Sequence, residues 1–298
     1  MVSLVVRGHP AYVPGAALPS ASTDPLTAGT APASSASSPA SSATASARPS
    51  PAGGPHGNPL GATAASYLAT RTGTVLAAVY NVNTGQTWSI GQGKPQDEAS
   101  IVKLDVLETL LAQRGANGLS ASDRALAQSM IEDSDNDSAT SLWDEVGAAT
   151  GIRAYNNTAR LTDTSPSLCV TCANFPWPGW GLTTTVPTDQ LTLLKALIAP
   201  GPLTKAEREY ALSLMENVTE SQRWGVSGGV PAQVTVALKN GWLPLDNADT
   251  DWQINSVGWI SGQGRNYLMA VLSTGDPSEQ YGIDTIDQLA SMVWNGLG

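Results

Sequence analysis

The sequence predicts an α/β protein of the α+β type, in which helices flank one antiparallel sheet built from both ends of the folded region. Two strand-like segments come first, a block of helix-like segments follows, and three more strand-like segments precede a closing helix. Helices and sheets bury their apolar faces against one another, and a sheet assembled from both chain ends fits this order. The short turns between neighbouring strands favour antiparallel pairing.

Residues 1–58 predict a disordered tail or linker, because Ala, Ser, Pro, Thr and Gly dominate from Pro19 to Pro59. Such a segment cannot bury enough apolar surface to offset the entropy of ordering it. The first residues do not form a proper signal peptide, since their apolar run is short and Arg7 follows it. We expect the true start to lie upstream, with a lost secretion signal or anchor, and the folded domain to span residues 59–298.

Apolar periodicity and turn residues place the expected elements. Strands are expected at residues 74–80, 86–90, 233–238, 252–260 and 267–273, the first two joined by the turn Asn83-Thr84-Gly85. Helices are expected near residues 67–69, from Ser100 onward, and at residues 120–130, 139–146, 188–197, 204–215 and 283–294. Residues 151–187 are rich in Pro, Thr, Asn and Trp, which predicts a loop with one short helix.

Composition excludes several classes of function. The net charge of −10 argues against nucleic-acid binding, and no run of 18 apolar residues could span a bilayer. Both histidines, His9 and His56, fall in the predicted tail, which removes Ser-His-Asp catalysis and most zinc sites from the folded domain. Cys169 and Cys172 lie in a Pro- and Trp-rich loop, and are interpreted as a local disulfide or two idle thiols.

The first candidate for chemistry is Ser100 with Lys103. A serine hydroxyl needs a neighbouring base to act as a nucleophile, and residues three apart on a helix can touch. The following residues leave little polar face, so this helix is expected to be buried, and burial lowers a lysine pKa. The pattern S-x-x-K is also compatible with a plain helix start and a surface lysine.

Two further motifs follow in the chain. Ser134-Asp135-Asn136 lies between two expected helices, and it predicts either a helix-capping turn or a proton-relaying serine beside a substrate-binding amide. Lys239-Asn240-Gly241 follows an expected strand, where it predicts either a surface turn or a carboxylate-binding lysine with a glycine that permits close backbone approach.

The order S-x-x-K, S-D-N, K-x-G is the motif set of class A β-lactamases and penicillin-binding proteins. The folded region therefore resembles the serine β-lactamase and DD-peptidase superfamily, nearest to class A. Thr183-Thr184-Thr185-Val186-Pro187 ahead of a helix and Trp224-Gly225-Val226 ahead of the Lys239 strand support the resemblance. It implies a β-lactamase/transpeptidase-like fold, with a five-stranded antiparallel sheet, an all-helical subdomain and the site between them.

The resemblance also implies roles. Ser100 would be acylated, Lys103 would take its proton, and Ser134 would pass a proton to the departing nitrogen. Asn136 would bind the substrate's side-chain amide and Lys239 its carboxylate, with Asn240 and Gly241 beside them. The backbone N–H groups of Ser100 and Trp242 would form the oxyanion hole, and the Trp242 ring is expected at the mouth of the site.

Two departures from the family pattern matter. Asn240 stands where the family usually has Thr or Ser, so the hydroxyl that contacts the substrate carboxylate is missing. Class A enzymes also carry a loop glutamate that activates the deacylating water, whereas this chain has no glutamate between Glu145 and Glu207. The family spacing lands near Val170, and Asp163 does not align cleanly. Slow hydrolysis of the acyl-enzyme is therefore expected.

The sequence thus predicts an exported, monomeric serine hydrolase of the extracellular space or cell envelope, without cofactor or metal. It would form a Ser100 acyl-enzyme with β-lactams or acyl-D-Ala-D-Ala-type amides. One alternative is a DD-peptidase or cell-wall peptide hydrolase with slow deacylation. The other is a penicillin- or cell-wall-binding module with little turnover, in which the tail acts as a tether.

Overall fold

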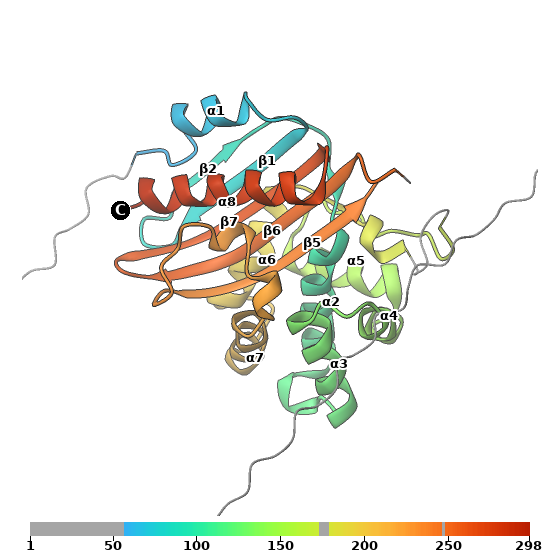
Figure 1. Ribbon diagram of the computed structural model, residues 1–298. Coiled ribbons are helices and arrows are strands. Elements are labelled where there is room, and N and C mark those ends of the chain that lie inside the picture. The colour runs from blue at the N-terminus through green and yellow to red at the C-terminus, as the bar shows by residue number, and fades with distance from the viewer. Residues whose placement is uncertain (1–56, 173–178, 246–247) are drawn as a thin grey trace, which may run out of the picture. The chain divides into compact units, whose positions relative to one another are not determined.

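The computed structural model describes residues 57–172, 179–245 and 248–298. The predicted tail, apart from its last two residues, lies outside the described residues. A five-stranded antiparallel sheet in the order β2-β1-β7-β6-β5 forms the centre of the domain (Figure 1). Its strands are β1 (Thr74–Asn81), β2 (Thr87–Ile90), β5 (Thr235–Pro244), β6 (Trp252–Gly262) and β7 (Arg265–Asp276).

Both ends of the domain contribute to this sheet, as predicted. The N-terminal strand β1 pairs with the C-terminal strand β7, with Ala77 opposite Val271. On the other side of β7, β6 pairs with β5, which forms the far edge. A separate two-stranded sheet joins β3 (Gln96–Asp97) to β4 (Thr184–Thr185) and ties the segment before Ser100 to the middle of the chain.

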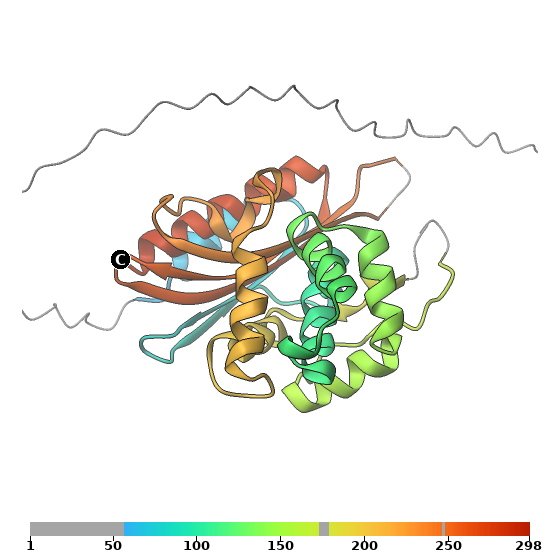
Figure 2. The same ribbon diagram turned by 90° about the horizontal axis from the view of Figure 1, so that it is seen from below.

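Helices cover both faces of the sheet (Figures 1 and 2). The closing helix α8 (Glu279–Gly296) and the short α1 (Ala62–Leu68) lie on one face, over a core that includes Val79, Met269 and Leu289. The larger core on the other face includes Leu107, Leu142 and Leu194 and is shared by the remaining helices. These are α2 (Val102–Arg114), α3 (Ala121–Glu132), α4 (Asn136–Glu145), α5 (Ala148–Ala159), α6 (Pro187–Ile198) and α7 (Lys205–Glu216).

The helix that follows Ser100 is buried, which confirms the sequence-based expectation. Every residue of α2 from Val102 to Leu111 is buried, including Asp105 and Glu108. The helix therefore runs through the middle of the helical layer. Glu108 accepts a hydrogen bond of 2.6 Å from the Tyr155 hydroxyl on α5, which fixes the two helices against each other.

The structure differs from the expected elements in two places. Residues 148–159 form a helix of three turns, longer than the short helix expected there, because Ile152 and Tyr155 give it an apolar face that packs against the core. The strand expected to end at residue 238 continues to Pro244. Pairing with β6 extends from Lys239 opposite Val257 to Pro244 opposite Trp252, and this pairing outweighs the turn preference of Asn240-Gly241.

Candidate active site

Ser100 lies in a short 3₁₀ turn, Ala99–Ile101, which leads directly into α2. The turn starts from Ala99 with a left-handed backbone (φ 50°), a conformation that is costly for a residue with a Cβ. Ser100 is half-buried and lines a cavity of about 290 Å³ together with Ser134 and Asn136. The serine therefore stands at the N-terminal end of a buried helix, beside an open cavity.

Lys103 lies one turn after Ser100, and its side chain is fully buried. Its ammonium donates hydrogen bonds to the Ser134 carbonyl (2.5 Å), to Ser134 Oγ (3.1 Å) and to Asn136 Oδ1 (2.7 Å). Burial lowers the pKa of Lys103 well below its usual value, and the positive charge of Lys239 lowers it further, against an opposing effect of Asp135. A lysine with a lowered pKa can lose its proton near neutral pH and act as a base.

Ser134 and Asp135 form the turn between α3 and α4, and Asn136 is the first residue of α4. Asp135 caps α4 by accepting a hydrogen bond of 2.7 Å from the Ser138 N–H, as the capping interpretation of this motif predicted. Ser134 itself has a left-handed backbone (φ 57°). This conformation belongs to a turn in which both the Ser134 carbonyl and its hydroxyl contact Lys103.

Lys239 reaches the same hydroxyl from the sheet. Its ammonium donates to Ser134 Oγ (2.9 Å) and to the Asn240 carbonyl (2.8 Å), and it is fully buried. Burial lowers the pKa of Lys239 to about 7. Ser134 Oγ accepts a hydrogen bond from each of the two lysines. Its own O–H can therefore donate to an acceptor in the cavity that Ser134 lines.

Gly241 lets strand β5 pass directly beside Ser100. A Cβ at this position would lie 2.6 Å from the Ser100 nitrogen, 2.7 Å from the Ile101 nitrogen and 2.9 Å from the Glu98 carbonyl oxygen. No side chain fits in that space. The next residue, Trp242, also lines the cavity, so the backbone of β5 forms one of its walls.

Trp242, expected at the mouth of the site, lines the cavity and also packs against residues outside it. Successive side chains of a strand point to opposite faces, and Gly241 faces Ser100. The Trp242 ring packs edge-to-face against Trp224, with centroids 6.0 Å apart, beside the core under α8. Trp224 and this core give the indole apolar partners.

Asn240, which the resemblance places beside the substrate, has a different set of partners. Its amide nitrogen donates to the carbonyls of Gln222 (2.7 Å) and Trp224 (3.1 Å), and its Oδ1 accepts from Ser256 Oγ (2.6 Å). The side chain is 1% exposed. It therefore fastens the loop before β5 to the sheet, and all three of these interactions would have to break before it could bind a substrate.

Among the described residues, no aspartate or glutamate lines the cavity. Asp163 is exposed, and it accepts a hydrogen bond from Thr162. Val170, at the family position of the loop glutamate, is 79% exposed. The cavity wall on this side is instead formed by Trp180 and Gly181, which belong to the 3₁₀ turn η3 (Gly179–Leu182).

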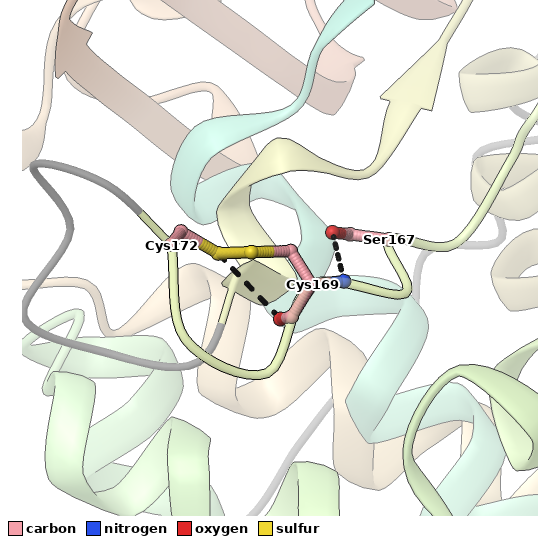
Figure 3. Close-up of a disulfide and its surroundings, with 3 residues drawn as sticks. All are labelled: Ser167, Cys169 and Cys172. Atoms are coloured by element: carbon pink, nitrogen blue, oxygen red, sulfur yellow. Dashed lines mark hydrogen bonds between the residues drawn. A yellow bond between two sulfur atoms is a disulfide. The ribbon is translucent and has the colours of Figure 1, made fainter.

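Cys169 and Cys172 are joined by a disulfide next to this turn (Figure 3). The Gly179 N–H donates a hydrogen bond of 2.8 Å to the Cys169 carbonyl, and a Cβ on Gly179 would lie 2.5 Å from Cys172 Sγ. Figure 3 also shows the hydrogen bond of 3.3 Å from the Cys169 N–H to Ser167 Oγ. The disulfide thus holds the start of η3.

Sequence reasoning did not single out Trp180. The indole N–H donates to Thr140 Oγ1 (3.2 Å) and the ring centroid lies 5.0 Å from Lys103 Nζ. Nine tryptophans occur in the chain, and an aromatic residue is usually core. The sequence feature that could have identified Trp180 is its position shortly before the Thr183-Thr184-Thr185 run.

In the described parts of the chain, no group of three or more His, Cys, Asp or Glu side chains is placed to hold a metal ion. Over the same residues, no helix is long and apolar enough to cross a bilayer.

A sequence model described as the Beta-lactamase enzyme family matches residues 113–297, which is more than half of the chain. The chain belongs to the beta-lactamase enzyme family. Family membership, the fold and the structural neighbours identify it as a serine hydrolase. The family match includes Ser134, Asn136 and Lys239, whereas Ser100 and Lys103 precede it.

Solved structures of beta-lactamases share the fold. TLA-1 extended-spectrum beta-lactamase is 17% identical over 79% of this chain and 96% of its own, with a TM-score of 0.70. A beta-lactamase from Xanthomonas campestris pv. campestris is 20% identical over 78% of this chain and 96% of its own, with a TM-score of 0.65. A mutant of PBP-A, in an acyl-enzyme complex with penicillin G, is 18% identical over 78% of this chain and 92% of its own, with a TM-score of 0.63. The predicted fold is therefore confirmed. None of the curated protein sequences matches this chain.

Proposed function

We propose that Ser100 forms an acyl-enzyme with β-lactams or with acyl-D-Ala-D-Ala-type amides. The observation that carries this proposal is the position of Ser134 Oγ, which lies within hydrogen-bond distance of two buried lysines, Lys103 and Lys239, beside Ser100. A serine nucleophile needs a nearby base, and an amide nitrogen needs a proton before it can leave. This cluster supplies both functions without a histidine.

The acylation step assigns each proton. Neutral Lys103 takes the proton of Ser100 Oγ as that oxygen bonds to the substrate carbonyl carbon. The carbon–nitrogen bond then breaks, and Ser134 gives its hydrogen to the departing nitrogen. Lys103, now an ammonium, returns a proton to Ser134 Oγ along their 3.1 Å hydrogen bond. The lowered pKa of Lys103 favours the neutral form that begins this sequence.

Substrate recognition uses the same cluster. The Lys239 ammonium attracts the carboxylate of the substrate, and the Asn136 side chain, half-buried at the cavity, binds the amide of the acyl group. The backbone N–H groups of Ser100 and Trp242 stabilise the oxyanion, since Gly241 brings β5 against the N–H of Ser100. Asn240 takes no part, because its amide is bound to the loop before β5.

One observation favours the DD-peptidase-type alternative, with slow deacylation, over an efficient β-lactamase. Hydrolysis of an ester acyl-enzyme by water requires a base that removes the proton of the water. Among the described residues, none of those lining the cavity is acidic. The disulfide supports the proposed export, because disulfides persist in oxidising compartments outside the cytosol.

The test is intact-mass spectrometry of the full chain over time after mixing with a penicillin, with Ser100→Ala as the control. A persistent mass gain of one penicillin, absent in Ser100→Ala, is the expected result. A transient gain with penicillin consumed in excess of enzyme would indicate an efficient β-lactamase. The absence of an adduct with several β-lactams would overturn the proposal and favour a binding module.

A further inference from the structure

Trp180 lies beside Lys103 and lines the same cavity as Ser100. Its ring centroid lies 5.0 Å from Lys103 Nζ. The side chain is 3% exposed, so the indole fills its space almost completely. A lysine ammonium at this distance from an indole face is attracted by the ring, which favours this placement.

We propose that Trp180 sets the lifetime of the Ser100 acyl-enzyme by occupying the space through which water would reach the ester. This inference rests on the proposed function and goes beyond it, because it names the residue that controls deacylation. During hydrolysis, the water oxygen bonds to the ester carbonyl carbon, the bond from that carbon to Ser100 Oγ breaks, a proton from the water ends on Ser100 Oγ, and the carboxylic acid is released. The first of these events requires a water molecule next to the ester.

Protein atoms occupy two other sides of Ser100. The backbone of β5 passes so close to Ser100 at Gly241 that no Cβ fits there. Ser134 stands between Lys103 and Lys239, and its hydroxyl is hydrogen-bonded to both. Trp180 covers a further side of the cavity.

The indole also offers nothing that would activate a water. Its single polar group, the N–H, is a donor and is used by Thr140 Oγ1 (3.2 Å). The acceptors near Lys103, which are the Ser134 carbonyl, Ser134 Oγ and Asn136 Oδ1, already receive its N–H groups. Trp180 therefore takes up space beside Lys103 without supplying a base of its own.

The ring is held firmly on both sides. Thr140 Oγ1 donates in turn to the Asn136 carbonyl (2.9 Å), which connects the indole to α4. Before Trp180, Gly179 is bound to the disulfide loop. After it, the Thr183 N–H bonds to the Trp180 carbonyl (3.1 Å), and the Thr183 carbonyl accepts from the Glu98 N–H (2.7 Å), two residues before Ser100. Trp180 is thus tied to the elements that carry Ser100 and Asn136.

The experiment measures loss of the adduct, separately from its formation. The full chain is acylated with a penicillin, excess reagent is removed, and the adduct is followed by intact mass in buffer and in buffer with hydroxylamine. Hydroxylamine attacks an ester without a protein base, so its effect reports access to the ester. The variants are Trp180→Ala, Trp180→Leu and Trp180→Phe. Trp259→Ala is the matched control, because Trp259 is half-buried and its indole N–H also donates to a side chain, Asn266.

Trp180→Ala is expected to shorten the adduct lifetime in hydroxylamine by at least about tenfold, or roughly 1.4 kcal/mol in activation free energy. Trp180→Leu should show an intermediate effect, and Trp180→Phe and Trp259→Ala should resemble the wild type. Equal lifetimes in Trp180→Ala and the wild type, with and without hydroxylamine, would overturn the inference. A variant that is acylated by the penicillin has a folded site. If Trp180→Ala is not acylated, the adduct lifetime of Trp180→Leu is compared with that of the wild type instead. Failure of the wild type to form an adduct would instead overturn the proposed function.

Discussion

Replacing Gly241 by alanine tests the closest contact in the site. The new Cβ would lie 2.6 Å from the Ser100 nitrogen and 2.7 Å from the Ile101 nitrogen, whereas ordinary contact begins at 3.4 Å. Strand β5 or the Ser100 turn must therefore move by about 0.8 Å, because these neighbours are backbone atoms and cannot rotate away. Such overpacking costs about 1–3 kcal/mol of folding free energy.

The displacement falls on the atoms that position the nucleophile. A misplacement of roughly 1 Å in a reacting group costs about 100-fold in rate, and loss of one oxyanion donor costs about 100- to 1,000-fold. We therefore expect the acylation rate of Gly241→Ala by a penicillin to fall by about two to three orders of magnitude, with a smaller loss of stability.

The assay is the second-order rate constant of acylation, measured by intact mass at several penicillin concentrations, with thermal unfolding measured in parallel. Gly201→Ala is the matched control, because the nearest atom to its Cβ would be the Ala199 carbonyl oxygen at 3.9 Å. An acylation rate within twofold of wild type and an unchanged unfolding temperature in Gly241→Ala would refute the reasoning. The approach of β5 to Ser100 would then not determine the reactivity of the site.

Three further predictions concern the charged and polar groups. The acylation rate should rise with pH as Lys103 loses its proton. Loss of the Lys239 charge above pH about 7 should lower the rate, because that charge holds the substrate carboxylate, and Lys239→Arg should abolish this fall in the same rate measurement. Asn240→Ala removes hydrogen bonds to three partners and should lower the free energy of unfolding in urea by about 2–3 kcal/mol, so an unchanged unfolding midpoint would contradict its structural role. Burial raises the pKa of Asp105 from 3.8 to about 7, so its contribution to stability is present below pH 3.8 and is lost as pH rises to 7. Asp105→Asn should therefore gain stability over wild type as pH rises, by up to about 4 kcal/mol in urea unfolding at pH 8, and a difference independent of pH would count against this.

The sequence predicted the parts of the fold that local chemistry determines. Ser120 and Thr204 begin helices α3 and α7 with capping boxes that use Asp123 and Glu207, and the apolar run after Ser100 became the buried helix α2. These features depend on residues close together in the chain, and so the pattern alone was sufficient.

Tertiary packing determined the remainder. The pair Asn240-Gly241 has turn chemistry, but it lies inside β5 because β6 supplies a partner for each residue. From the sequence, the Asn240 amide was expected to lie beside the substrate. In the folded protein it is hydrogen-bonded to Gln222, Trp224 and Ser256 instead. Composition alone does not distinguish Trp180 from the other eight tryptophans for the position beside Lys103.

The strand order also determines when the site forms during folding. Lys239 and Ser134 are 105 residues apart in the chain. Strand β1 cannot pair with its partner toward the centre of the sheet, β7, until β7 has been synthesised. Contacts of such long range slow folding, because the intervening chain must close before they contribute stability. A nascent or truncated chain therefore carries Ser100 without its chemistry. Under the proposed function, labelling by penicillin would count completed molecules, which makes the reactive serine a reporter of how far the chain has folded.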